Sequence, residues 1–313
     1  MLRIEGLGTA LVTPFKDGAV DWESYWALVA RQVAAGVDFL VPLGSTAETP
    51  CLEDDEKVEL LDIARKSFAG TVVAGVGTNS LKATLRNIRL LEPCNPDAWL
   101  VVVPYYNKPT QEGMYQYFKA VAESTDKAIV LYNVPGRTGS NIKPETVLRL
   151  AQIPNIVAIK EASGDIAQIL AIRRDAPSDF AVLSGNDDQT LPLMAAGCNG
   201  IISVASNLAP VQMAALCKAL REGDRAEAVR INNALMPLYD ACFVESNPIP
   251  AKGGLSLLGP LTLEVFNFDI SGNEDNELHP LNIPFILLTL EVFHLDISGN
   301  ADNDLHLLNI PII

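Results

Sequence analysis

Histidine is missing from residues 1–260 of this 313-residue chain, since His279, His294 and His306 all lie in the last part. Without imidazole, the first 260 residues cannot form Ser-His-Asp or Cys-His triads or the common histidine zinc sites. Lysine and arginine are in turn missing from residues 261–313, which hold nine Asp or Glu. The net charge of −15 is the opposite of the basic excess that nucleic-acid-binding proteins carry, so we expect no nucleic-acid partner.

Cysteines are few and widely spaced, which predicts neither a disulfide framework nor a metal site and indicates a reducing compartment. The stretch 189–217 is uncharged, but Asn199, Asn207 and Pro210 interrupt it, so it predicts a buried strand with flanking helices instead of a membrane span. No apolar leader-like segment precedes the first strand-like run. We expect a soluble, cytoplasmic protein that has no membrane partner.

Eight short apolar runs alternate with amphipathic stretches before residue 225. The runs are rich in Val, Ile, Leu and Ala over nearly every position, as is typical of strands buried on both faces. They span 6–13, 39–43, 72–77, 98–104, 128–133, 156–161, 180–184 and 200–205. Eight uninterrupted β-α units predict an α/β fold, a (β/α)8 TIM barrel followed by C-terminal helices, with a doubly wound sheet as the alternative.

The C-terminal part departs from this alternation. We expect the catalytic barrel to occupy 1–224 and a truncated helical region to occupy 225–260. Residues 261–286 recur as 288–313 with 20 of 26 positions identical. This atypical repeated tail indicates a recent tandem duplication of foreign or frame-shifted sequence. Its DISGNEDNE segment lacks EF-hand spacing, so a solvated turn is the interpretation favoured over a calcium loop.

Lys160 is the strongest candidate for a catalytic residue. It interrupts the apolar run 156–159, where a cation is unfavourable. Desolvation would favour its neutral amine, which can attack a ketone and form a Schiff base. The alternative is a structural lysine that extends to solvent or pairs with Glu161.

Other polar residues follow the predicted strands, where barrel enzymes place their active sites. Tyr132 ends the neighbouring strand and could exchange a proton with an imine intermediate. Backbone amides of Ser45 and Thr46 could bind a carboxylate, and Arg137 could bind a second one. The alternatives are a rim tyrosine, helix-capping hydroxyls and a surface arginine.

No metal or nucleotide site is predicted. Gly75 and Gly77 lack the spacing of a dinucleotide fingerprint, and no Walker motif is present. Asp187 and Asp188 could hold a metal, but a solvated acidic turn is the favoured interpretation.

Taken together, the sequence motifs indicate a protein family far more specifically than any one of them does alone. They are Gly8-Thr9, Thr13-Pro14-Phe15, GSTAE at 44–48, PYYNKPTQEG at 104–113, YNVPGRTG at 132–139, IKEASG at 159–164, LSGND at 183–187, GIISV at 200–204 and NPIP at 247–250. From about residue 3 to about residue 258, the chain resembles the dihydrodipicolinate synthase (4-hydroxy-tetrahydrodipicolinate synthase) family of the pyruvate-dependent class I aldolases.

This resemblance implies that the substrates are pyruvate and L-aspartate 4-semialdehyde, and that the reaction serves lysine and diaminopimelate biosynthesis. Lys160 would form a covalent imine with pyruvate, with no metal and no organic cofactor. Tyr132, Thr46 and Tyr106 would form a proton relay, Tyr106 reaching across a tight dimer within a homotetramer. The implied substrate-binding residues are Ser45, Thr46, Arg137, Gly185 and Ile202.

The resemblance leaves three matters open. At positions matching the lysine-feedback pocket of inhibited members stand Asp54, Lys57 and Ala83, which predicts weak or absent inhibition by lysine. The tail replaces the further C-terminal helices of the family, which puts stability and assembly in question. The alternative functions are a sister aldolase acting on N-acetylneuraminate or a 2-keto-3-deoxy sugar acid, and an inactive barrel with a disrupted C-terminus.

Overall fold

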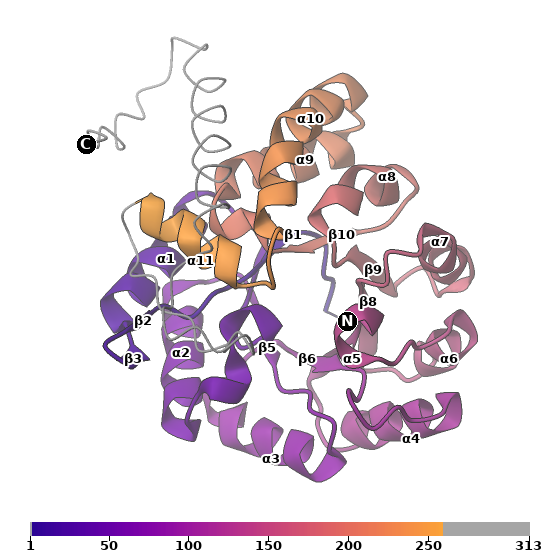
Figure 1. The fold of residues 1–313 in the computed structure, drawn as a ribbon. Coiled ribbons are helices and arrows are strands. Elements are labelled where there is room, and N and C mark those ends of the chain that lie inside the picture. Colours follow the sequence, from indigo (N-terminus) through magenta and orange to yellow (C-terminus); the bar gives the residue numbers. More distant parts are fainter. Residues whose placement is uncertain (1, 259–313) are drawn as a thin grey trace.

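A computed structural model describes residues 2–258, which form a closed parallel barrel ringed by helices (Figure 1). The barrel strands follow one another in chain order, and β1 pairs with both β4 and β10 to close the ring. They are β1 Gly6–Ala10, β4 Phe39–Val41, β5 Thr71–Gly75, β6 Ala98–Val102, β7 Ala128–Asn133, β8 Ile156–Glu161, β9 Ala181–Ser184 and β10 Gly200–Ser203. Each lies within or at the edge of a predicted run, so the closed barrel is confirmed and the doubly wound sheet is wrong.

Helices cover the outside of the barrel, and short polar side chains start several of them. Asp21, Ser80, Thr110, Asp165 and Asp224 each accept a hydrogen bond from a first-turn amide. The helices are α1 Trp22–Ala34, α2 Asp54–Ser67, α3 Leu81–Leu91, α4 Gln111–Ala122, α5 Pro135–Thr138, α6 Pro144–Leu150, α7 Ile166–Asp175, α8 Thr190–Ala195, α9 Pro210–Glu222, α10 Arg225–Cys242 and α11 Ile249–Leu257. A small hairpin, β2 Phe15–Lys16 with β3 Ala19–Val20, follows β1.

Two apolar clusters hold the fold together. The larger one fills the space between barrel and helices and includes the fully buried Trp99 and Phe118. The smaller one fills the barrel interior with inward side chains such as Val130, Ala158 and Ile202. Because side chains alternate along a strand, residues two positions from Val130 and Ala158 also face the interior. This places Tyr132 and Lys160 on the inner face.

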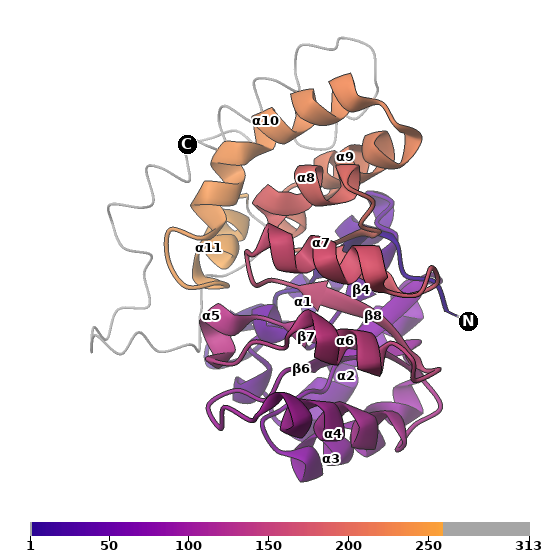
Figure 2. The same ribbon diagram turned by 90° about the vertical axis from the view of Figure 1, so that its right-hand side faces the viewer.

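The last described helices pack beside the barrel. Helices α9 and α10 follow β10 and pack against each other. Figure 2 shows α5 and α11 on the same side of the barrel, opposite the N-terminus. The expected repeat over 261–313 lies outside the described residues. Within 2–258, no helix is long and apolar enough to cross a bilayer.

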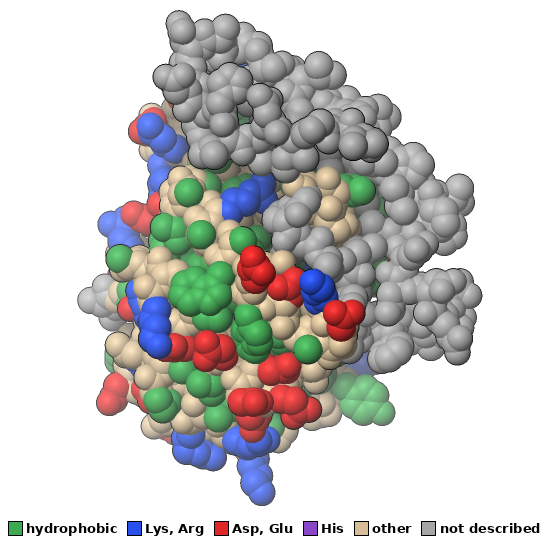
Figure 3. Space-filling model, turned by 90° about the vertical axis from the view of Figure 1, so that its left-hand side faces the viewer, with side chains coloured by type: hydrophobic (Ala, Val, Ile, Leu, Met, Phe, Trp, Pro, Cys, Tyr) green, Lys and Arg blue, Asp and Glu red, His purple; other side chains and the backbone are tan. Residues whose placement is uncertain are grey.

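Charges of both signs occur on the face of the molecule drawn in Figure 3. On the face in Figure 3, acidic side chains alternate with Lys and Arg and with scattered hydrophobic side chains. The described residues visible there form no continuous basic patch.

Candidate active site

Lys160 and Tyr132 meet inside the barrel. They are direct cross-strand partners in the β7–β8 register, and the Lys160 Nζ lies 4.4 Å from the centroid of the Tyr132 ring. Both are buried, with 4% and 6% of the residue exposed. Within residues 2–258, the Lys160 Nζ makes no ion pair, which is unusual for a buried lysine. The amine is therefore held against an aromatic face and not tied to a carboxylate.

Glu161 does not pair with Lys160, so the structural alternative stated for this lysine is wrong in that respect. Since the two are adjacent in a strand, they point to opposite faces. The Glu161 carboxylate is fully buried and accepts hydrogen bonds from Asn133 Nδ2 at 3.0 Å, the Ser163 amide at 2.8 Å and Gln168 Nε2 at 3.0 Å. Burial raises the pKa of Glu161, and these hydrogen bonds oppose that rise. The Asn133–Glu161 pair braces the strand ends that carry Tyr132 and Lys160.

Ser45 and Thr46 lie in a tight turn after β4. The turn spans Ser45–Ala47 and ends at Glu48, whose φ of 53° is left-handed. The Glu48 amide donates to the Ser45 carbonyl at 3.2 Å. The Ser45 and Thr46 amides donate no hydrogen bond within residues 2–258, so both can bind an anion. Thr46 is buried with 2% exposed, and its hydroxyl accepts a hydrogen bond from Asn247.

Arg137 and Tyr106 lie on neighbouring loops at the same end of the barrel. Arg137 is in α5, is exposed, and donates from Nη2 to the Asn247 carbonyl at 3.0 Å. The Tyr106 amide donates to the Thr138 carbonyl at 3.1 Å, and Tyr106 has a φ of 67°. Its side chain is not packed into the barrel of its own chain, since 86% of the residue is exposed.

Gly185 and Ile202 line the end of the barrel at β9 and β10. Ile202 is fully buried in the interior cluster. A Cβ on Gly185 would lie 2.6 Å from the Ala162 Cβ, so only glycine fits where this loop crosses the end of β8.

Asp187 is not part of a solvated acidic turn, and that prediction is wrong. Its carboxylate is buried and accepts hydrogen bonds from Ser203 Oγ and from the amides of Val204 and Ala205, both at 3.1 Å. Burial raises the pKa of Asp187, while these hydrogen bonds oppose the rise. Asp187 therefore ties the loop after β9 to the end of β10, next to Ile202. The structure leaves only Asp188 exposed.

Sequence reasoning missed two residues of the C-terminal segment. Asn247 lies in the loop between α10 and α11 and contacts both Thr46 and Arg137. Lys252 in α11 is fully buried and forms an ion pair with Glu48, Nζ to Oε1 at 2.8 Å. Asn247 belongs to a quoted motif, but no spacing rule joins residue 247 to residues 46 and 137. The lysine within the apolar sequence of α11 could have predicted a buried ion pair, although not its partner.

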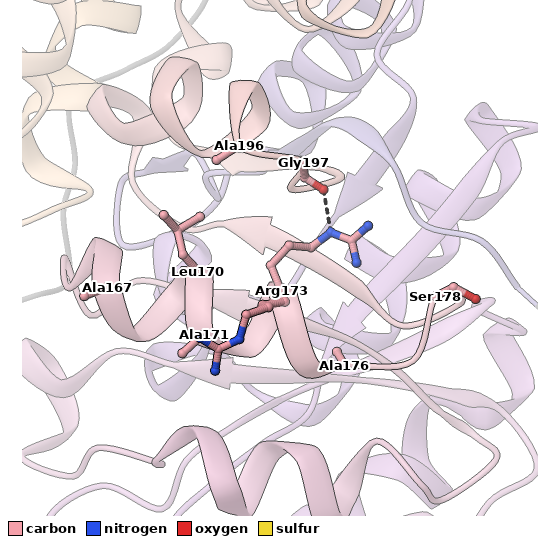
Figure 4. A pocket seen from close by; sticks show the side chains of 9 residues that line it. Ala167, Leu170, Ala171, Arg173, Ala176, Ser178, Ala196 and Gly197 are labelled. Atoms are coloured by element: carbon pink, nitrogen blue, oxygen red, sulfur yellow. Dashed lines mark hydrogen bonds between the residues drawn. The ribbon is translucent and has the colours of Figure 1, made fainter.

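One surface depression is remote from these residues. It has a volume of about 750 Å³ and lies outside the barrel, between α7 and the loop after α8 (Figure 4). Arg173 reaches across it, and its Nε donates to the Gly197 carbonyl. No predicted site residue lines it. Among residues 2–258, no three His, Cys, Asp or Glu side chains are grouped as metal ligands.

The chain is similar to known proteins over most of its length. Residues 3–266 match the model of the dihydrodipicolinate synthetase family. The chain is 49% identical over 260 residues to a 4-hydroxy-tetrahydrodipicolinate synthase from Thermotoga neapolitana, covering 81% of this chain and 88% of that one.

Solved structures agree with this similarity. A monomeric dihydrodipicolinate synthase variant superposes with a TM-score of 0.89 at 43% identity, covering 93% of this chain and 97% of that chain. The enzyme from Acinetobacter baumannii, solved in complex with pyruvate, gives a TM-score of 0.88 at 36% identity, with coverage of 93% and 99%. The chain belongs to the dihydrodipicolinate synthetase family.

Proposed function

We propose that this protein condenses pyruvate with L-aspartate 4-semialdehyde through a Schiff base on Lys160, giving 4-hydroxy-tetrahydrodipicolinate. The observation that carries the proposal is the Lys160 amine, which is buried against the Tyr132 ring and makes no ion pair within residues 2–258. The five cysteines all lie within residues 2–258 and form no disulfide there, which fits a reducing cytoplasm.

In the proposed reaction, the Lys160 amine attacks the pyruvate ketone and the adduct loses water to form an imine. Removal of a proton from the pyruvate methyl group gives an enamine, which attacks the aldehyde carbon of the semialdehyde. The amino group of the semialdehyde part then attacks the imine carbon, which closes the ring and expels Lys160 as its free amine. The Tyr132 ring adjoins the Lys160 nitrogen, and its hydroxyl would exchange protons in these steps.

Substrate binding follows from the charges of the two substrates. The amides of Ser45 and Thr46 would hold the pyruvate carboxylate, with Gly185 and Ile202 lining its pocket. Arg137 would hold the semialdehyde carboxylate, since a guanidinium forms paired hydrogen bonds with a carboxylate.

Self-association follows from Tyr106. Tyr106 is 86% exposed and is not packed into its own barrel, which supports its assignment to the site of a second copy, in a tight dimer within a homotetramer. Light scattering of the wild type and of a Tyr106→Phe variant tests this. A fully active monomer would contradict it.

The function is tested by supplying pyruvate with L-aspartate 4-semialdehyde and following consumption of both. Turnover with the semialdehyde and not with sugar aldehydes supports the proposal. Pyruvate release from N-acetylneuraminate or a 2-keto-3-deoxy sugar acid would instead indicate a sister aldolase.

A further inference from the structure

Asn247 contacts two separate loops of the proposed site. Its side-chain Nδ2 donates to the Thr46 hydroxyl at 2.9 Å, and its main-chain carbonyl accepts from Arg137 Nη2 at 3.0 Å. Thr46 follows β4 and Arg137 follows β7, and these strands are not neighbours in the barrel. The chain segment between α10 and α11 therefore joins the two loops.

The hydrogen bond from Asn247 Nδ2 to the Thr46 hydroxyl restricts where the Thr46 hydroxyl proton can point. A threonine hydroxyl has one donor and two acceptor positions. Because the Asn247 amide donates to it, the Thr46 proton points elsewhere and can be passed on. Thr46 is 2% exposed and Asn247 4% exposed, so water does not readily replace this contact.

The side-chain oxygen of Asn247 indicates that a contribution to folding stability is not enough to account for an asparagine at this position. Asn247 Oδ1 is buried and has no hydrogen-bond partner within residues 2–258. An unsatisfied buried acceptor destabilises the folded state, so this atom lowers what Asn247 contributes to folding stability. Leucine has nearly the same shape and would remove this unsatisfied atom.

We propose that Asn247 is a positioning residue that orients the Thr46 hydroxyl for proton transfer through its side chain and holds Arg137 through its carbonyl. The inference rests on the proposed function. A substitution at Asn247 distinguishes these two roles, because it removes the side-chain contact to Thr46 and leaves the main-chain carbonyl that holds Arg137 in place. The proton-transfer steps should then suffer, while binding of the semialdehyde carboxylate should not.

The test is Asn247→Leu, measured as kcat, as KM for both substrates and as Tm. We expect kcat to fall about 10- to 100-fold, as for loss of an oriented proton-transfer group. KM for the semialdehyde should stay within about twofold, because Arg137 keeps its partner. The Tm should not fall, which a purely structural role does not predict. The matched control is Asn232→Leu, since Asn232 is 7% exposed and also has an unpaired Oδ1, but lies in α10. Its kcat should match the wild type.

A double-mutant cycle identifies the partner. In a Thr46→Val background, Asn247→Leu should cause little further loss of kcat, because the hydroxyl that it orients is gone. Independent, additive losses would overturn the inference, as would a wild-type kcat in Asn247→Leu. Trapping of the pyruvate imine on wild-type Lys160 keeps this result apart from the proposed function. If the imine forms and Asn247→Leu is fully active, only the inference fails; if no imine forms, both fail.

Discussion

The buried ion pair between Lys252 and Glu48 gives the sharpest stability prediction. Both side chains have 0% exposure, and the Lys252 Nζ also lies 4.3 Å from the centroid of the Phe15 ring. Lys252→Met keeps the volume but leaves the buried Glu48 carboxylate without its cation. Removing one partner of a buried pair destabilises a protein by about 3–5 kcal/mol. At roughly 2–4 °C per kcal/mol for a domain of this size, Tm should fall by roughly 6–20 °C.

Two further variants make this prediction refutable. Lys66→Met is the matched control. Lys66 forms an ion pair with Asp62, its side chain is 69% exposed, and exposed ion pairs contribute only about 0–1 kcal/mol to the free energy of unfolding. In Lys252→Met/Glu48→Gln, much of the lost free energy of unfolding should return, since neither charge of this pair remains. Chemical denaturation measures all three. The reasoning is refuted if Lys252→Met is as stable as Lys66→Met, or if the double variant is no more stable than Lys252→Met.

Three other outcomes are expected. L-Lysine should inhibit turnover weakly or not at all, because Lys57 and Arg86 flank Asp54 and repel an ammonium group; strong inhibition at micromolar lysine would contradict this. Burial raises the pKa of Glu161, so its contribution to stability is complete below the unfolded pKa of about 4.3 and is lost as the pH rises. The free energy of unfolding of Glu161→Gln relative to wild type should therefore increase between about pH 4.5 and 7, and a pH-independent difference would argue against this assignment. A chain ending at Pro260 should still form the pyruvate imine, because every proposed site residue lies within 2–258; its loss on truncation would show that the tail supports the site.

Much of the fold was predictable because buried parallel strands are nearly continuous in apolar residues and eight such runs alternate with helices. Lys160 was predictable for the same reason, as a cation inside an apolar run. The partners of buried charges were not predictable. Glu161 follows Lys160 directly, but strand alternation sends it to the opposite face, and Asp187 turns inward to accept from Ser203.

The C-terminal segment shows a second limit of sequence reasoning. Contacts from Asn247 to Thr46 and from Lys252 to Glu48 join residues about 200 positions apart. Such contacts depend on the closed barrel and on how the last helices fold back over its end. No local pattern encodes them.

The most direct test concerns Lys160, which we propose forms the imine with pyruvate. The purified protein is incubated with pyruvate and reduced with borohydride, and the modified peptide is located by mass spectrometry. We predict a single pyruvate adduct on Lys160 that is absent in Lys160→Ala. A folded protein that gives no adduct, or an adduct on another lysine, would contradict the account.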